Sequence, residues 1–220
     1  CPFAAILLPE RGHPPPMSPA DFRTLANFIW SVADLLRGPY RPPQYERIML
    51  PMVVLRRFDC VLDRTKQAVL KRHEELVSRG KVQDVDPILN RLATGADRQP
   101  LGFHNHSPLD FAKLKADPDQ VRRHLVSYIN GFSRNVREIF ERFDFDKEIE
   151  KLEESNRLYQ VVARFAEIDL HPRRVDNITM GLVFEDLIRR FNEAANETAG
   201  DHFTPREVIQ LMVNLLLEPD

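Results

Sequence analysis

Apolar residues at helical spacing, separated by helix-start signals, are the feature that most constrains what this chain can fold into. The segment that begins at Ser18 matches a capping box with proline at the first helical position, and apolar residues follow it at intervals of three and four up to Leu36. Gly38-Pro39 then predicts a helix end. Strand-like alternation between turn dipeptides is absent from the sequence, as is any repeat of fixed period. The sequence therefore predicts an all-α, multi-helix bundle.

A second long apolar segment covers residues 45–62, and we expect Pro51 to kink this helix or to split it. A break is expected at residues 171–174, and Thr179 is expected to start a strongly amphipathic helix beyond that break. Between these elements, helices are expected over residues 65–78, 86–92, 117–132, 135–143, 146–155 and 157–168, with a further helix opening at Ser107-Pro108.

The chain divides into three parts. Residues 1–16 are expected to be an extension that comes from cloning or from an upstream reading frame, because Met17 suits a natural start. Residues 17–172 are expected to form a helical domain, and residues 173–220 the incomplete beginning of a second domain. Hydrophobic residues make up 43% of the chain and charged residues 29%, which suits a soluble globular protein.

Net charge, apolar runs and cysteine content limit the partners and the cellular location that we expect for this protein. The net charge of −2 argues against a dedicated DNA-coating protein, so any nucleic-acid contact is expected to be local. The apolar run at residues 3–8 is too short to cross a bilayer, and no membrane partner is expected. The two cysteines, Cys1 and Cys60, have no zinc or disulfide spacing, which favours a cytoplasmic location. Cys60 is expected to be a small buried apolar residue.

Few side chains suggest a chemical role. The sequence contains no Gly-x-Gly turn, and we predict neither a catalytic residue nor a metal site in it. The one metal-like cluster is His104-Asn105-His106 with Asp110 and His124, for which a solvated or capping loop is the favoured interpretation. Paired arginines can bridge phosphates, although most such pairs cover apolar surface with their stems. The pairs are residues 56–57, 122–123, 173–174 and 189–190.

A helix-start signal near the end of the sequence is the most specific local pattern. Thr204 suits an N-cap, Pro205 the first helical position and Glu207 the third, which together make a capping box. Taken alone, this pattern predicts only a well-capped core helix. Its apolar face consists of Val208, Leu211, Met212, Leu215 and Leu216.

Three stretches of the sequence point to a family when they are taken together. They are residues 27–38 (NFIWSVADLLRG), residues 45–59 (YERIMLPMVVLRRFD), and residues 181–188 (GLVFEDLI) with the turn at residues 203–207 (FTPRE). In order and separation these stretches resemble the modification (M) subunit of type I restriction–modification systems, a family of adenine-N6 DNA methyltransferases. The resemblance implies a helical N-terminal domain followed by the first helices of a truncated α/β methyltransferase domain.

The same resemblance implies that the intact protein transfers a methyl group from S-adenosylmethionine to adenine N6 in DNA. The aromatic-Thr-Pro turn would form part of the S-adenosylmethionine site, where amides at a helix start can face a carboxylate. The implied partners are a specificity subunit, a second M subunit, a restriction subunit and double-stranded DNA. The implied cofactor contacts are Asp201, His202, Phe203, Thr204, Pro205 and Arg206.

The sequence also departs from the family pattern. The glycine-rich cofactor loop and the Asn-Pro-Pro-aromatic loop that grips a flipped adenine do not occur in these 220 residues. We therefore expect this chain alone to lack methyltransferase activity and to contribute to subunit assembly and DNA clamping. The alternative is a non-enzymatic helical protein-interaction module. A standalone DNA-binding protein is less favoured, because the net charge is slightly negative.

Overall fold

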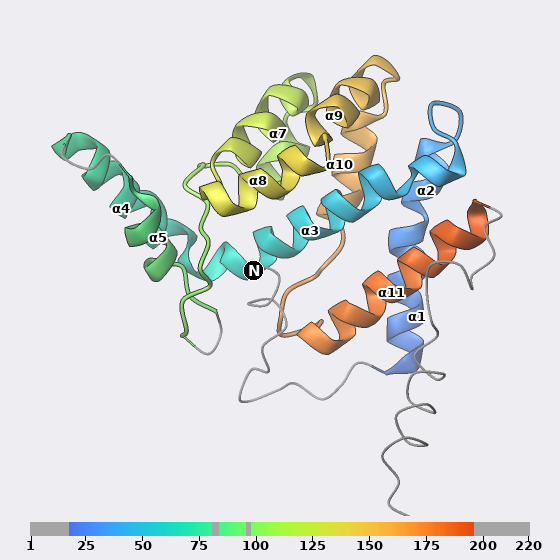
Figure 1. Cartoon of the computed structure of the whole chain (residues 1–220), viewed down its shortest axis with the longest axis horizontal. Coiled ribbons are helices and arrows are strands. Elements are labelled where there is room, and N and C mark those ends of the chain that lie inside the picture. Colours follow the sequence, from blue (N-terminus) through green and yellow to red (C-terminus); the bar gives the residue numbers. More distant parts are fainter. Residues whose placement is uncertain (1–17, 81–83, 96–97, 196–220) are drawn as a thin grey trace, which may run out of the picture.

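The computed structural model describes residues 18–80, 84–95 and 98–195, and in these residues the chain is helical with no β-strand (Figure 1). The predicted all-α bundle is confirmed for this part of the chain. Its α-helices are α1 (Pro19–Trp30), α2 (Val32–Leu36), α3 (Glu46–Leu62), α4 (Lys66–Arg79), α5 (Asp86–Leu92), α6 (Phe111–Ala116), α7 (Val121–Asn130), α8 (Arg134–Arg142), α9 (Phe145–Glu154), α10 (Leu158–Ala166) and α11 (Asn177–Ala194).

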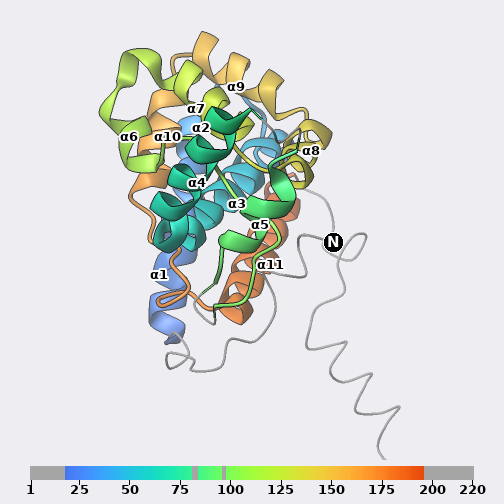
Figure 2. The same cartoon turned by 90° about the vertical axis from the view of Figure 1, so that its left-hand side faces the viewer.

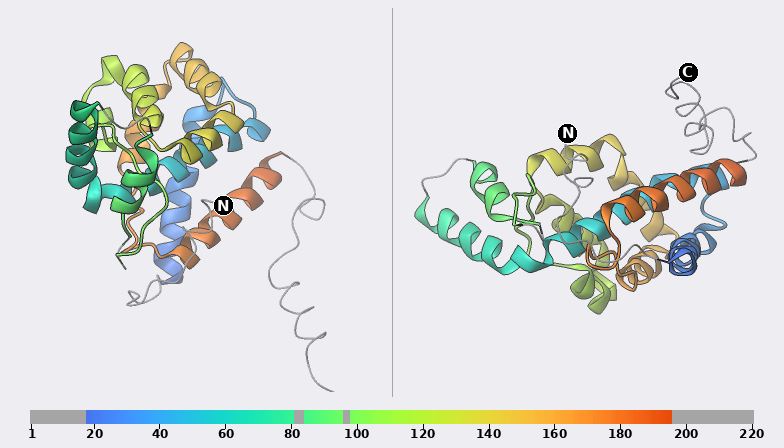
Figure 3. Two further views of the ribbon diagram at one scale, coloured as in Figure 1. Left: turned by 60° about the vertical axis from the view of Figure 1, so that its left-hand side comes forward. Right: turned by 90° about the horizontal axis from the view of Figure 1, so that it is seen from below.

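Helix α3 runs through the middle of the molecule and is buried on nearly every side (Figure 3). Ile48, Met52 and Leu55 are fully buried, and Phe58 is nearly so. The helix contacts α9, α10 and α11, which approach it from different directions. A helix that is largely apolar is stable only where other elements cover it, and α3 is therefore the element around which the rest of the fold packs.

Pro51 was expected to kink or to split this helix, and the split is wrong because α3 is continuous. A single α-helix extends from Glu46 to Leu62 with Pro51 inside it. Proline in a helix interior removes one backbone hydrogen bond and costs about 3 kcal/mol relative to alanine. Pro51 is itself buried. Burial of most of this helix stabilises the uninterrupted form by more than the proline costs, because each fully buried aliphatic side chain contributes about 1.5–3 kcal/mol.

Helix starts agree with the sequence where a side chain caps the first turn. The Ser18 Oγ accepts a hydrogen bond from the Asp21 amide at 3.2 Å and begins α1. The helix expected at Ser107 begins later, at Phe111, because the Asp110 carboxylate accepts from the Lys113 amide at 2.8 Å. The first predicted helix is also divided: the Ser31 hydroxyl donates to the Phe28 carbonyl at 2.6 Å, at the boundary between α1 and α2.

The helices form a compact group with one projecting pair. Helices α7 to α10 lie together on one side of α3, and α11 crosses α1 on another (Figures 1 and 2). Helices α4 and α5 pack against each other and extend from the end of α3, away from α11 (Figure 1). No helix in the described ranges combines the length and the apolar character needed to cross a membrane.

Candidate functional site

The predicted cofactor contacts, Asp201 to Arg206, lie outside the described residues, so their role remains a prediction. The described element that precedes them in the chain is α11. Asp176 caps this helix, with its carboxylate accepting from the Thr179 amide at 2.6 Å. With this cap the helix begins at Asn177, two residues before Thr179, which the sequence interpretation had taken as the first residue.

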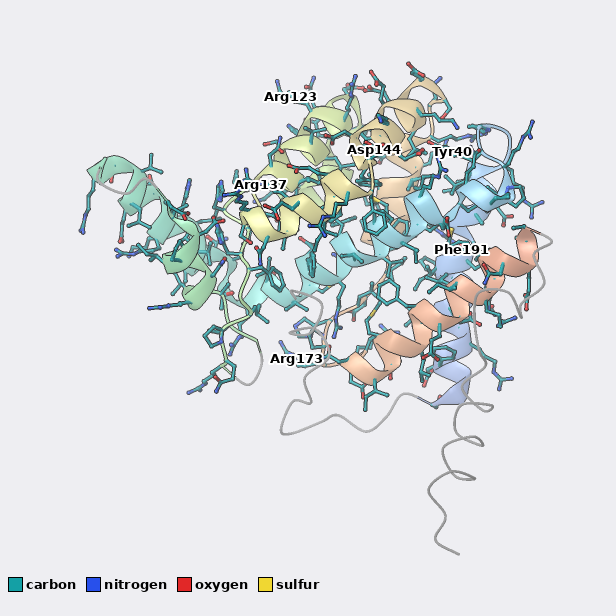
Figure 4. The ribbon with its side chains drawn as sticks, viewed as in Figure 1. Tyr40, Arg123, Arg137, Asp144, Arg173 and Phe191 are labelled. Atoms are coloured by element: carbon teal, nitrogen blue, oxygen red, sulfur yellow. The ribbon has the colours of Figure 1, made fainter. Side chains whose placement is uncertain are left out.

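One face of α11 packs into the bundle. Met180, Val183 and Leu187 are buried, as is Phe191 near the end of the helix. The Phe191 ring (labelled in Figure 4) lies 5.4 Å from the Trp30 ring of α1, measured between ring centroids. The strongly amphipathic helix expected from the sequence is thus confirmed, with its apolar face turned into the bundle; Ile188 on this helix is 37% exposed.

The buried guanidinium of Arg57 joins α3 to the segment that leads into α11. It donates hydrogen bonds to the carbonyl oxygens of Leu170 and Val175, the second at 2.7 Å, and to the Asn177 side-chain oxygen at 2.8 Å. Its neighbour Arg56 donates to the Ile168 carbonyl at 2.8 Å. In this pair, considered as a phosphate contact from sequence, Arg57 is buried and Arg56 is half-buried, and both bind main-chain carbonyls of the protein itself.

The other arginine pairs are mostly engaged with acidic side chains. Arg122 forms salt bridges with Glu150 and Glu153 on α9, and Arg189 and Arg190 both pair with Asp186. Arg174 lies 3.6 Å from an Asp169 carboxylate oxygen.

Arg123 and Arg173 are the two members of these pairs that are exposed and form no salt bridge with another described residue (Figure 4). Arg123 lies on α7, and Arg173 lies in the turn before α11. The pairs therefore offer scattered single charges and no continuous phosphate-binding stripe.

Of the three histidines in the sequence cluster, only His104 is buried, at 0% exposed, so for this residue the solvated part of the solvated-or-capping-loop interpretation is wrong. The His104 Nδ1 lies 2.7 Å from the Asn90 side-chain oxygen, and its Nε2 lies 3.3 Å from the His106 Nδ1. The His106 ring stacks on the His73 ring with centroids 4.2 Å apart. Burial lowers the pKa of both His104 and His106 to about 4, so both imidazoles are neutral at pH 7.

The remaining members of the sequence cluster lie elsewhere. Asp110 caps α6, and His124 lies 3.9 Å from an Asp117 carboxylate oxygen. Within the described ranges, no group of three or more histidine, cysteine or acidic side chains is arranged to hold a metal ion. Cys60 is buried as expected, and its burial raises the pKa of the thiol.

A polar cavity of about 430 Å³ lies at the carboxyl end of α3. The Asp59 carboxylate there accepts from the Tyr128 hydroxyl at 2.8 Å and pairs with Arg56 at 2.7 Å. The Lys66 ammonium donates to the Leu109 carbonyl at 2.8 Å, and burial lowers its pKa to about 8. These charged groups already bind one another or the backbone. We therefore interpret the side chains that line this cavity as a structural polar network and not as a ligand site.

The α4–α5 arm, defined here as residues 64–98, carries a charge opposite to that of the rest of the chain. It contains eight lysines and arginines against five aspartates and glutamates, whereas the whole chain has a net charge of −2. Lys71, Arg79 and Arg91 are exposed and make no salt bridge with any residue that the structure describes. A shallow groove on the arm is lined by Arg72, Pro87, Ile88, Arg91 and Leu92.

Projection and net positive charge make this arm a candidate surface for a polyanion. Figure 2 shows α4 and α5 toward the viewer, in front of the bundle. A projecting helical pair can reach a phosphate backbone that the body of the bundle would not approach. The arginine pairs considered from the sequence do not include these cations, because Lys71, Arg79 and Arg91 are separated by eight and twelve positions and lie on two helices that pack against each other.

Comparison with known protein families gives two matches. The model described as the HsdM N-terminal domain matches residues 25–165, and the model described as N-6 DNA methylase matches residues 175–220. The first match alone covers more than half of the chain. No curated protein matches the chain. The two matches are separated by residues 166–174, the segment whose carbonyl at Leu170 accepts a hydrogen bond from Arg57.

Proposed function

The chain belongs to the HsdM N-terminal domain family, the family of type I restriction–modification M subunits, and we propose that the intact protein is a DNA adenine-N6 methyltransferase. The order of the two family matches within one chain is the observation that carries this proposal. A helical HsdM N-terminal domain runs directly into a segment that matches N-6 DNA methylases. The methyl donor would be S-adenosylmethionine, in line with the methylase match.

In this proposal the predicted cofactor residues form one wall of the S-adenosylmethionine site. The helix start at Thr204 and Pro205 would present free backbone amides and a partial positive charge to the carboxylate of the donor. Phe203 would pack beside it. Asp201, His202 and Arg206 complete the proposed contacts. These assignments rest on the family resemblance of the turn.

A methylation assay tests the proposal. The product of the complete gene, assembled with its specificity subunit, should transfer a labelled methyl group to adenine N6 in DNA. The 220-residue chain should show no turnover, because it contains neither a Gly-x-Gly turn nor an Asn-Pro-Pro-aromatic loop. A complete gene whose sequence after codon 220 encodes neither motif would favour the non-enzymatic interaction module instead. Turnover by the 220-residue chain would contradict our account of the cofactor and base-binding loops.

The α4–α5 arm supports a role of the helical part in holding DNA, next to contacts with the specificity subunit, a second M subunit and the restriction subunit. Each phosphate neutralised by the arm should contribute about 0.9 to the slope of log K against log salt concentration. Replacement of Lys71, Arg79 and Arg91 by glutamate in the assembled protein should therefore weaken duplex binding and lower that slope by about 2–3.

The matched control for the arm changes the same number of charges at other exposed positions. Arg47, Arg123 and Arg142 are exposed and lie outside the arm, so a triple glutamate variant there has the same net charge. An equal loss of affinity and of salt slope in both triple variants would show that the arm has no special part in DNA binding.

A further inference from the structure

Lys66, the first residue of α4, is a half-buried amine on the wall of the polar cavity at the carboxyl end of α3. Its ammonium donates a hydrogen bond to the Leu109 carbonyl at 2.8 Å and lies 5.2 Å from the centre of the Tyr128 ring. It forms no salt bridge with any residue that the structure describes. Asp59 takes its ion pair from Arg56 instead, so the Lys66 amine is not bound to a carboxylate.

The charged groups that face this amine are mostly acidic. Besides Lys66, four aspartates and one arginine line the cavity: Asp59, Asp63, Asp110, Asp169 and Arg56. Lys113 of α6 also acts on the amine electrostatically, and His106 and His171 are neutral at pH 8 because burial lowers the pKa of both. A negatively charged reagent is therefore disfavoured in this cavity, since an added anion meets several carboxylates.

Burial makes this amine more reactive near pH 8 than an exposed lysine. Its pKa is lowered to about 8, so about half of it is uncharged at pH 8. An exposed lysine with a pKa of about 10.4 is only about 0.4% uncharged at the same pH. Lower basicity weakens the attack of each neutral amine, as it does for thiols, and offsets part of this gain. Lysines whose surroundings lower the pKa in this way are the ones that form Schiff bases with carbonyl compounds.

We propose that Lys66 is a modification site, at which a small uncharged aldehyde that enters this cavity forms a Schiff base. The ammonium first loses a proton to water, and the neutral nitrogen then attacks the carbonyl carbon. The carbonyl oxygen takes up two protons, one from the nitrogen and one returned by solvent, and leaves as water. The product is a protonated imine, which carries the same single positive charge as the ammonium that it replaces.

Conservation of charge is the reason for an aldehyde and against an acyl donor. An amide at Lys66 would remove a cation from a cavity lined by four aspartates, and the Asp59 side chain among them is only 11% exposed. Carboxylates held away from water cost free energy when a nearby cation is lost. A cavity of about 430 Å³ has room for an aldehyde of a few carbons. A covalent bond to one amine also needs no set of side chains that holds a ligand by other contacts.

Reductive trapping in the 220-residue chain tests this proposal. Acetaldehyde with cyanoborohydride converts each imine to an ethylamine, and mass spectrometry of the peptides then gives the rate at each lysine. At pH 8, Lys66 should be trapped about fivefold faster than Lys71, an exposed lysine on the same helix. This preference should disappear in concentrated urea, where the cavity is lost. Equal rates in the folded chain would overturn the proposal, as would a preference that persists in urea.

Two comparisons separate the effect of the cavity from simple exposure. Glyoxylate is a matched anionic aldehyde of similar size, and the acidic lining should make the Lys66-to-Lys71 ratio about threefold lower with glyoxylate than with acetaldehyde. The ratio with acetaldehyde should also fall as the pH rises above about 8, because Lys66 is then already uncharged while Lys71 is still losing protons. Equal ratios for the two reagents, or a ratio that does not change with pH, would contradict the proposed site.

Asp110→Asn tests whether the acidic lining sets the preference between the two aldehydes. Asparagine can still cap α6 but removes one negative charge from the cavity, so the discrimination against glyoxylate should fall by about half. Asp119→Asn is the matched control, since Asp119 is exposed and does not line the cavity. Equal effects of the two variants would overturn the part assigned to the lining. The inference does not rest on methyl transfer, so its failure can be told apart from the failure of the proposed function.

Discussion

Replacement of Arg57 by methionine should destabilise the whole fold, because this side chain joins α3 to the segment that leads into α11. Methionine keeps the apolar stem but removes three hydrogen bonds, two of them to the carbonyls of the buried residues Leu170 and Val175. A buried carbonyl left without a donor costs about 1–3 kcal/mol. Removal of a buried charge recovers part of that cost, since the guanidinium no longer needs to be desolvated. We expect a net loss of about 3 kcal/mol in the free energy of unfolding.

Urea unfolding followed by tryptophan fluorescence measures this loss directly. Trp30 is the only tryptophan in the chain, and its ring contacts Phe191 of α11, so the signal reports whether α11 is docked. For a domain of this size, a loss of 3 kcal/mol also lowers the melting temperature by about 6–12 °C. Arg123→Met is the control, since Arg123 is exposed on α7. If Arg57→Met changes the unfolding free energy by less than about 0.5 kcal/mol, the assignment of Arg57 as an anchor is wrong.

Two further predictions concern the packing around the histidine cluster. Gly131→Ala should cost about 1–3 kcal/mol, measured by urea unfolding, because a Cβ at Gly131 would lie 2.5 Å from the Ser107 Cβ; a neutral effect would mean that the loop yields easily. Stability should also fall as the pH drops from about 6.5 to about 4. The pKa of both His104 and His106 in the folded protein is about 4, so in this range only the unfolded chain takes up protons, and stability is fully present above pH 6.5. For the fully buried His104 this amounts to about 2–3 kcal/mol, and His104→Gln should show a shallower pH dependence in unfolding experiments. An unchanged slope would place the proton uptake elsewhere.

Local signals in the sequence predicted most helices, and long-range contacts account for what they missed. The cap at Ser18 and the apolar face of α7 are visible within a few residues of sequence. The burial of His104 could not be predicted in this way, because its neighbour His106 stacks on His73, which lies more than thirty positions away on α4. Arg57 likewise looked like half of a surface pair, since its acceptors lie more than a hundred residues further along the chain.

The candidate site shows the same division. The family was visible in three short stretches, and the matches to residues 25–165 and 175–220 agree with it. The α4–α5 arm combines cations from two helices that pack against each other. Helix periodicity reports which face of one helix is apolar, but it does not report which cations of two helices share a surface.

The anchor at Arg57 also bears on how freely the two family modules can diverge or be recombined. Two of its acceptors are main-chain oxygens, which every amino acid carries. The residues between the two family matches can therefore change in type without loss of these hydrogen bonds to Arg57, provided that the backbone follows the same path. Hybrid proteins that exchange everything after residue 175 between relatives should keep the Arg57 hydrogen bonds at this junction. Hybrids with a residue inserted or deleted there should lose these hydrogen bonds.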